Sequence, residues 1–227
     1  AGWQGGRVRP AAPPLTHMSG DDKLRSVAEG MRAVYDRQAH FLDSTRDRRL
    51  ILEGNWLERL RATLPLAGSV LDLGCGAGEP IASYFIEAGH DLTGLDFSPV
   101  MLEIARERFP EATWIEADMR DFDLGRRFDA IIGWDSFFHL TPEGQRQAVG
   151  AISHHLQTGG HVLLTVGDED GETLGAVGTD PVYHSSYSPE GYRTLFADAG
   201  MEVVDLVLGD MTAGGRNVLM ARKTRQK

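Results

Sequence analysis

The sequence predicts a doubly wound α/β fold, in which a mostly parallel β-sheet carries helices on both of its faces. Three observations support this prediction. Short apolar runs alternate with segments of helical spacing, a glycine-rich turn follows the first of these runs, and capping residues mark the starts of several helices. Such alternation is typical of repeated strand–helix–strand units, whose strands lie parallel in one sheet.

The composition is that of one globular domain. Of the 227 residues, 41% are hydrophobic and 25% are charged, which suffices for a buried core. The net charge of −10 argues against a nucleic-acid partner, because proteins that bind nucleic acids neutralise phosphates with a basic face. The single cysteine excludes an internal disulfide, and no apolar run reaches the ~18 residues that cross a bilayer. We expect a cytoplasmic protein without a membrane partner, either a monomer or a homodimer.

Three segments are expected along the chain. Residues 1–19 are rich in glycine, proline, alanine and arginine and lack the apolar stretch of a secretory signal, so we expect a disordered arm or an appended leader. Residues 20–62 should form two N-terminal helices that act as a lid, since apolar side chains recur at helical spacing within residues 21–42 and 46–60. Residues 63–227 should form the ligand-binding α/β domain.

The strands and helices of the α/β domain follow in a regular order. A serine or threonine precedes a proline at positions 98, 141 and 188, and this pair is typical of a helix start. Two apolar runs, residues 202–208 and 217–221, are joined by a connection too short for a crossover helix, so they should pair antiparallel. The preceding strands are expected at residues 69–73, 91–96, 113–116, 129–134 and 161–166.

The glycine-rich turn follows the first strand, in the sequence VLDLGCGAG of residues 70–78. Its glycines let the backbone pass close to a ligand at the positive end of the next helix, residues 81–87. A dinucleotide site needs the spacing G-x-G-x-x-G, but here the third glycine comes one position early and position 79 is a glutamate. A pyrophosphate would be repelled by that carboxylate, whereas a positively charged ligand would tolerate it.

Acidic residues end the second and third strands. Asp96 lies about twenty residues after the first glycine, where it is placed to accept both hydroxyl groups of a ribose. Together with Asp118, the turn and Asp96 resemble the class I, Rossmann-like superfamily of S-adenosylmethionine-dependent methyltransferases, of the small-molecule type. The resemblance covers residues 35–222. It implies S-adenosylmethionine as the methyl donor and the strand order 3-2-1-4-5-7-6 with the last strand antiparallel, in agreement with the short connection.

The resemblance also implies roles for individual residues of the donor site. The methionine portion would lie against Asp72, Gly74, Cys75, Gly76 and Gly78, with Cys75 as a small residue beside the donor and not as a nucleophile. Asp96 would bind the ribose. The remaining donor contacts would be Phe97, Ser98, Met101, Asp118, Met119 and Trp134. Residues 35–41 are similar to a segment that covers the donor in many small-molecule methyltransferases, so we expect Tyr35 to contact it from the lid.

Acceptor chemistry is expected after the fourth strand, because ligands of parallel sheets bind beyond the carboxyl ends of the strands. Asp135 and His139 are the candidate acid–base residues there, since a histidine titrates near neutrality and an aspartate can orient it or fix a cationic amine. The alternatives are that Asp135 only faces the donor and that His139 is a helix cap or a packing residue. Methyl transfer can also proceed without a base, through positioning alone.

A second acceptor segment is expected at residues 183–187, a polar and aromatic loop in which Tyr183 and His184 are candidate substrate contacts. The acidic run at residues 167–172 should be a solvated loop, with a hard cation or an amine as the alternative ligand. Two histidines at residues 154–155 should be exposed on a helix. Without a further ligand at suitable spacing, no metal site is expected there.

These features predict an enzyme that transfers the methyl group of S-adenosylmethionine to an unidentified small molecule and releases S-adenosylhomocysteine. The lack of a basic stripe favours a small acceptor over RNA or DNA. Two alternatives stay open: a nucleoside-binding sensor without catalysis, and a nicotinamide-dependent oxidoreductase on the same fold. The glutamate at position 79 weighs against the oxidoreductase.

Overall fold

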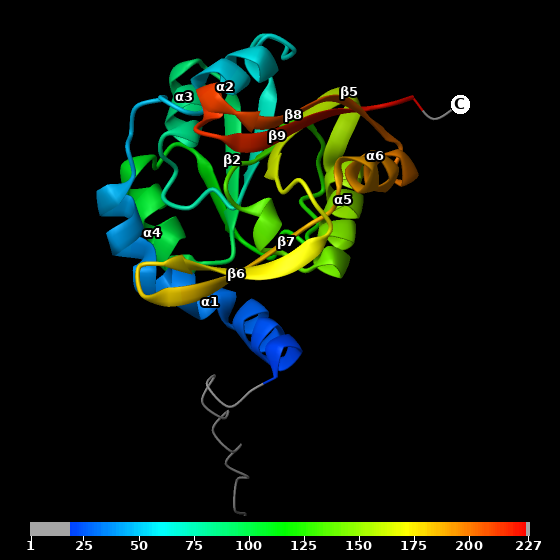
Figure 1. The fold of residues 1–227 in the computed structure, drawn as a ribbon. Coiled ribbons are helices and arrows are strands. Elements are labelled where there is room, and N and C mark those ends of the chain that lie inside the picture. The colour runs from blue at the N-terminus through cyan, green and yellow to red at the C-terminus, as the bar shows by residue number, and fades with distance from the viewer. Residues whose placement is uncertain (1–18, 226–227) are drawn as a thin grey trace, which may run out of the picture.

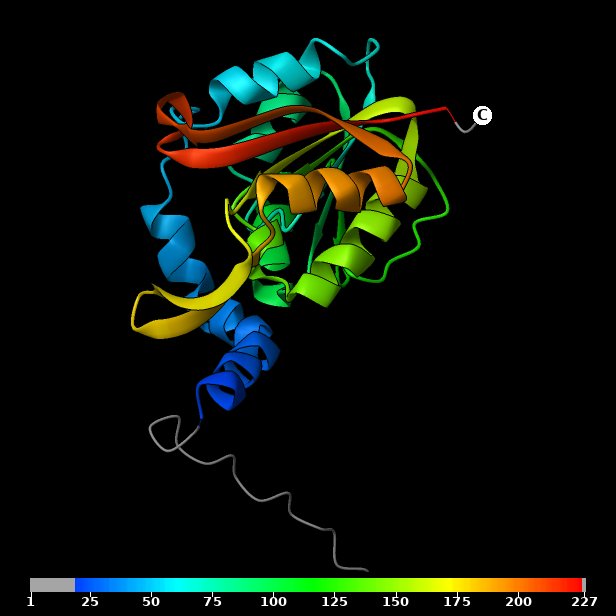
Figure 2. The same cartoon turned by 45° about the vertical axis from the view of Figure 1, so that its right-hand side comes forward.

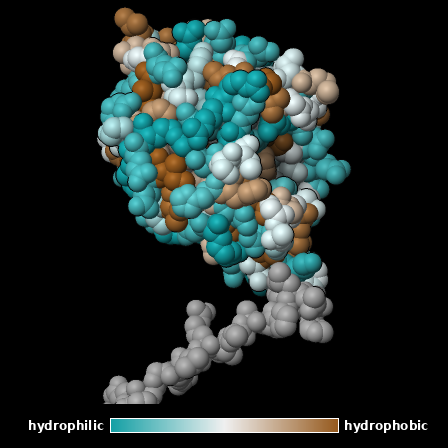
Figure 3. All heavy atoms as spheres, turned by 90° about the vertical axis from the view of Figure 1, so that its left-hand side faces the viewer, coloured by the Kyte–Doolittle hydropathy of each residue, from teal (hydrophilic) through white to brown (hydrophobic). Residues whose placement is uncertain are grey.

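The computed structural model of the chain describes residues 19–225. The expected leader at residues 1–19 therefore lies outside the described part, apart from Ser19, which caps the first helix. Within the described part, no helix is both long enough and apolar enough to span a lipid bilayer. Figure 3 shows one face of the molecule, on which hydrophilic residues predominate and hydrophobic residues form small groups.

A seven-stranded sheet forms the centre of the molecule, in the order β3-β2-β1-β4-β5-β9-β8 (Figure 1). The strands pair in parallel except for β9, which runs antiparallel to both of its neighbours. This arrangement confirms the predicted fold and the antiparallel pairing of the last two strands. The strands are β1 Ser69–Leu73, β2 Asp91–Asp96, β3 Thr113–Glu116, β4 Phe128–Gly133, β5 Leu156–Val166, β8 Met201–Asp210 and β9 Arg216–Lys223.

Helices cover both faces of the sheet (Figure 2). Their bounds are α2 Gly54–Arg61, α3 Ile81–Glu87, α4 Pro99–Arg108, α5 Pro142–His155 and α6 Pro189–Asp198, with short 3-10 turns η2 at Phe137–His139 and η3 at Met211–Ala213. Ile152 of α5 and Phe196 of α6 belong to the core on one face, and Leu57 of α2 and Phe85 of α3 to the core on the other. Each core buries one side of the sheet.

The predicted helix starts are confirmed at three positions. Ser98, Thr141 and Ser188 cap α4, α5 and α6, and each side chain accepts a hydrogen bond from a backbone N–H in the first turn. The N-terminal helices differ from the prediction, because α1 runs from Gly20 to Thr45 and α2 begins only at Gly54. The segment between them is extended at Arg46. Nη2 of Arg46 lies 2.7 Å from Oε1 of the buried Glu53, later in the chain.

A two-stranded hairpin, β6 (Gly171–Val177) and β7 (Asp180–Ser186), stands apart from the main sheet. The sequence predicts loops here, and that prediction is wrong, since the two strands pair antiparallel along their whole length. The hairpin lies beside α1 in both ribbon views (Figures 1 and 2). Its strands form because α1, far away in the sequence, supplies their apolar partners. The buried side chains of this contact are Val27, Met31, Val34, Val182 and Tyr183.

Candidate donor and acceptor site

A cavity of about 960 Å³ opens where β1 to β4 end, and α1 and the hairpin cover it. This volume is at the upper end of the range of small-molecule sites, roughly 300–1,000 Å³. Eleven of the predicted site residues line it: Tyr35, Gly74, Gly76, Asp96, Phe97, Met101, Asp118, Met119, Asp135, His139 and Tyr183. The other six do not line it: Asp72, Cys75, Gly78, Ser98, Trp134 and His184.

Asp96 occupies the end of β2 and is held by backbone groups. Its carboxylate accepts hydrogen bonds from Gly76 N at 2.9 Å and from Ser98 N at 2.8 Å. Burial raises the pKa of Asp96 to about 6, although these backbone hydrogen bonds favour the ionised form and limit the rise. At neutral pH the cavity therefore contains a fixed anion at the turn.

The glycines of the turn serve different purposes. A Cβ atom on Gly74 would lie 2.4 Å from the Cβ of Ser136, so this position must be glycine for the two segments to pack. A Cβ on Gly76 would meet only the sulfur of Met101, at 3.9 Å, although the φ of +52° also favours glycine. The Cβ position of Gly76 is thus open toward the cavity, whereas the Cβ position of Gly74 is filled by Ser136.

Three residues of the predicted methionine site lie behind the turn. Asp72 is buried, and its pKa is raised to about 7 by burial and by the nearby charge of Asp96. The thiol of Cys75 is also buried, which raises its pKa, and it packs toward Gly94. Gly78 faces the rings of Phe109 and Trp114. These residues pack behind the turn and do not line the cavity.

The predicted adenine slot contains one partner that the sequence did not indicate. The carboxylate of Asp118 accepts hydrogen bonds from Arg120, from the side-chain Nε at 2.9 Å and from the backbone N at 2.9 Å. Both residues line the cavity. Ser98 does not line it, because its hydroxyl donates to Asp36 at 2.6 Å and joins α1 to the start of α4.

Glu79 lies away from the cavity, contrary to the expectation that it would stand near a positively charged donor. Its carboxylate lies 2.8 Å from Nε of Arg48 and 3.7 Å from Nη1 of Arg108. Two guanidinium groups therefore compensate its charge. Arg108 also donates to the carbonyl oxygen of Ala77 and to the carboxylate of Asp43, which fastens the end of α1 to the turn.

His139 lies in η2 and forms a pair with Tyr35 of α1. Its Nδ1 lies 2.8 Å from the carbonyl oxygen of Tyr183, which can only accept, so Nδ1 carries the proton. Nε2 then accepts from the hydroxyl of Tyr35 at 2.7 Å. Burial lowers the pKa of His139 to about 4 and raises the pKa of Tyr35 above its usual value. Both groups are neutral at pH 7, and the histidine lone pair is already occupied.

Asp135 is held by arginine side chains that the sequence did not connect with it. Nε and Nη2 of Arg216 each lie 2.7 Å from one of its carboxylate oxygens, and Nη1 of Arg46 lies at 3.5 Å. Its φ of +52° is unusual for a residue other than glycine. Because both oxygens are engaged by a bidentate guanidinium, the structure favours a fixed anion over the predicted general base.

The hairpin presents Tyr183 and Glu172 to the cavity. Tyr183 is buried, and its hydroxyl donates to Oε2 of Glu172 at 2.5 Å. The sequence suggested that Glu172 belongs to a solvated loop. In the structure it lies on strand β6 and lines the cavity. His184, from the opposite face of β7, packs edge-on against Phe138 and at a tilt against His139, with ring centroids 5.1 Å and 4.9 Å away. His184 packs behind His139, which lines the cavity, and does not line it itself.

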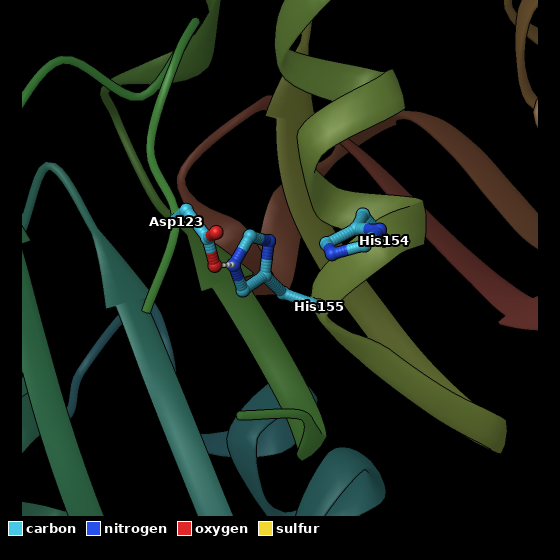
Figure 4. Close-up of side chains that lie close together, drawn as sticks. All are labelled: Asp123, His154 and His155. Atoms are coloured by element: carbon cyan, nitrogen blue, oxygen red, sulfur yellow. Dashed lines mark ion pairs between the residues drawn. The ribbon is translucent and has the colours of Figure 1, made fainter. Parts of the chain in front are cut away.

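A second group of titratable residues lies far from this cavity. Figure 4 shows Asp123 beside His155, with the preceding residue of α5, His154, close by. His155 is buried, contrary to prediction, and its Nδ1 lies 2.9 Å from the carbonyl oxygen of Ala151. Its Nε2 accepts a hydrogen bond from Leu124 N at 3.1 Å. Since both nitrogens are used, a metal ion would have to displace a backbone hydrogen bond.

Comparisons with known proteins agree with this geometry. A family described as a methyltransferase domain matches residues 70–160. A dTDP-3-amino-3,4,6-trideoxy-alpha-D-glucopyranose N,N-dimethyltransferase of Streptomyces venezuelae is 41% identical over 107 residues, which cover 46% of this chain and 45% of the relative. A dTDP-3-amino-3,6-dideoxy-alpha-D-glucopyranose N,N-dimethyltransferase of Streptomyces fradiae is 34% identical over 146 residues, 60% of this chain and 57% of the relative. The matched segment thus spans about half the length of these curated relatives.

Solved structures extend the likeness to most of the chain. An amino pentose methyltransferase from Micromonospora echinaspora with bound S-adenosylmethionine has a TM-score of 0.66 and 27% identity, and the match covers 83% of this chain and 96% of that one. A didemethyltoxoflavin N1-methyltransferase of Burkholderia thailandensis shares the fold, with a TM-score of 0.69 at 22% identity over 95% of this chain and 94% of that one. Over part of its sequence and over most of its fold, the chain is therefore similar to S-adenosylmethionine-dependent methyltransferases.

Proposed function

We propose that the chain transfers the methyl group of S-adenosylmethionine to the nitrogen of a small amine and releases S-adenosylhomocysteine. One observation carries this proposal: a single cavity is lined both by the glycine turn with Asp96 and by the neutral Tyr35–His139 pair. The names of the curated relatives specify dimethylation of amino sugars, which supports nitrogen as the acceptor atom.

The donor is proposed to lie along the ends of β1 to β3. Asp96 would accept the two ribose hydroxyls, since a carboxylate can accept both while it keeps its backbone hydrogen bonds. Phe97, Met101 and Met119 would flank the adenine, and Asp118 would meet its edge in exchange for part of its contact with Arg120. The anionic surroundings favour the positively charged sulfonium.

The acceptor is proposed to lie between Tyr35, His139 and Tyr183. The sequence predicts that Tyr35 contacts the donor, and its ring does lie edge-on to Phe97 with the ring centroids 5.8 Å apart, so we propose that the ring borders the donor and the hydroxyl the acceptor. The hydroxyl of Tyr35 donates a hydrogen bond to Nε2 of His139, so the lone pairs of its oxygen remain free to accept a hydrogen bond from an N–H group of the amine. That hydrogen bond would orient the nitrogen lone pair toward the methyl group. His139 is then a positioning residue for Tyr35, and its proton on Nδ1 stays with the carbonyl of Tyr183.

Methyl transfer in this arrangement needs the neutral form of the amine, which a basic amine reaches by losing a proton to water before it attacks. The neutral amine attacks the methyl carbon, the C–N bond forms as the C–S bond breaks, and the electron pair of that bond returns to sulfur as a neutral thioether. The methylated ammonium ion afterwards loses its proton to water. Holding the two reactants in line supplies the acceleration, and such positioning can be worth roughly 7–11 kcal/mol.

α1 and the hairpin are proposed to act as the lid of the site. Arg37 and Gln38 of α1 both bond to the carboxylate of Asp180 at the start of β7, at 3.0 Å and 2.8 Å. The pair would therefore move as one unit. Its closure over the donor would exclude water from the sulfonium.

The proposal is tested with S-adenosylmethionine that carries a deuterated methyl group and a panel of small amines, alcohols and thiols. We expect S-adenosylhomocysteine together with an acceptor whose labelled methyl group is on nitrogen, identified by mass spectrometry. Label on oxygen or sulfur alone would refute the assignment of nitrogen. If the donor binds in calorimetry but no acceptor yields S-adenosylhomocysteine, the sensor hypothesis is correct instead.

A further inference from the structure

The charges that line the cavity are unevenly divided. Seven carboxylates line it, against three guanidinium groups, and within residues 19–225 no lysine takes part. Asp135 is compensated from outside the lining by Arg216. The wall is therefore acidic, which suits a cationic donor and is unfavourable for a second ligand with several negative charges.

The three arginines of the lining are Arg25, Arg32 and Arg120. Arg32 forms an ion pair with Glu116, and Arg120 donates from Nε to both oxygens of Asp118 at 2.9 Å and 3.0 Å. Of the three, Arg25 alone has no ion-pair partner in the described part of the chain, and it is an exposed residue of α1. A diphosphate is normally held by several cations or by N–H groups at once. One exposed arginine does not provide such a site.

Glu172 adds a negative charge on the acceptor side. Glu172 is an exposed residue of β6, the strand that lies beside α1 (Figures 1 and 2), and its Oε2 accepts a hydrogen bond from the hydroxyl of the buried Tyr183 at 2.5 Å. The same Tyr183 bonds to His139 through its backbone carbonyl oxygen, so Glu172 and the Tyr35–His139 pair contact opposite ends of one residue that lines the cavity. Glu172 takes part in no ion pair among residues 19–225, and its Oε1 atom is left to accept from a ligand.

We propose that Glu172 selects an acceptor with a basic amine and no diphosphate group. This inference rests on the proposed function and refines it, because the two relatives described above are named for dTDP-linked sugars. A carboxylate at this position attracts a basic amine and repels phosphate oxygens, and repulsion of the wrong ligand is a common source of specificity. Glu172 does not react, and is a specificity residue.

The experiment compares two acceptors that share one amino sugar: dTDP-linked 3-amino-3,6-dideoxyglucose and the methyl glycoside of the same sugar. We measure kcat and KM for methyl transfer to each, and calorimetry with thymidine 5′-diphosphate in the presence of S-adenosylhomocysteine. We expect at least about tenfold higher kcat/KM for the glycoside and no diphosphate binding up to about 1 mM. Glu172→Gln should raise the KM for the glycoside about tenfold with little change in kcat. Glu169→Gln, the same change on an exposed residue outside the cavity lining, should alter neither constant.

Each other outcome has a definite meaning. Micromolar binding of thymidine 5′-diphosphate, or a higher kcat/KM for the nucleotide-linked sugar, would overturn the inference and leave amine methylation intact. A Glu172→Gln variant with the wild-type kcat and KM for both sugars would show that Glu172 does not determine acceptor specificity. If neither sugar is methylated although S-adenosylhomocysteine binds, the inference fails for this amino sugar, and the panel of amines described above then decides separately whether the proposed function also fails.

Discussion

The proposed donor side and the proposed acceptor side of the cavity are built in different ways. The donor side comes from the ends of adjacent parallel strands, and its central contact joins Gly76 to Asp96, 20 residues later. The acceptor side joins Tyr35 to His139 across 104 residues, and His139 to Tyr183 across another 44. The first is held by backbone N–H groups of the sheet edge, the second by side chains of a helix and a hairpin packed on each other. Changes of acceptor can therefore occur without disturbing the donor site.

The largest expected effect is on the donor side. Replacing Asp96 with alanine should weaken S-adenosylhomocysteine binding by about 100-fold, because the variant loses the ribose acceptor and frees the backbone N–H groups of Gly76 and Ser98. Isothermal titration calorimetry measures the change. Asp129→Ala is the matched control, since Asp129 also accepts two hydrogen bonds, from Ser69 at the other end of β1. Equal losses in both variants would mean that the effect is on folding.

The next effect separates turnover from donor binding. Tyr35→Phe keeps the ring and removes the hydroxyl that bonds to His139, so we expect kcat/KM for the amine to fall about 30-fold. Tyr187→Phe is the control, because its hydroxyl donates to the carbonyl of Pro142 away from the cavity. Unchanged kinetics in Tyr35→Phe would exclude its hydroxyl from the reaction.

The two glycines of the turn should respond in opposite ways. Gly76→Ala meets no close atom in the protein, strains a backbone with a φ of +52°, and fills space next to the proposed donor, so donor affinity should fall about tenfold with a modest loss of stability. Gly74→Ala collides with Ser136 and should lower the free energy of unfolding by about 3 kcal/mol. Urea unfolding and calorimetry distinguish the two. The reverse assignment of effects would show that Gly74, and not Gly76, faces the ligand.

The smallest expected effect is the pH dependence of donor affinity. The pKa of Asp96 is raised to about 6, so the carboxylate becomes protonated as pH falls through that value and loses both its charge and part of its acceptor capacity. Between pH 8 and pH 5.5 the affinity for S-adenosylmethionine should therefore fall about fourfold, because only about a quarter of Asp96 remains ionised. Calorimetric titrations across this range measure it. An affinity that stays constant would mean that Asp96 is ionised throughout.

Most of the central sheet and of the donor side could be predicted from local patterns. The bounds of β1 and β2 follow from apolar runs, the helix starts at Ser98 and Thr141 from capping chemistry, and the turn with Asp96 from spacing. Each of these signals lies within a few residues of the feature it determines. Local physics decides such elements, whatever packs on them later.

The acceptor side could not be predicted in this way, because its contacts join distant segments. The hairpin is stable only against α1, and nothing near Asp135 in the sequence indicates that Arg216 pairs with it. The same reason explains His155, which is buried because Leu124 and Ala151 use both of its nitrogens. The residue type identifies a candidate base. Whether its lone pair is free or already accepts a hydrogen bond depends on the tertiary structure.

The most direct test of the division into two sides is the affinity of Tyr35→Phe for S-adenosylhomocysteine, measured by calorimetry beside that of Asp96→Ala. The account predicts that Tyr35→Phe binds the donor product within about threefold of the wild type although it methylates poorly, whereas Asp96→Ala loses about 100-fold in affinity. Comparable losses of affinity in the two variants would contradict it, because Tyr35 would then belong to the donor site.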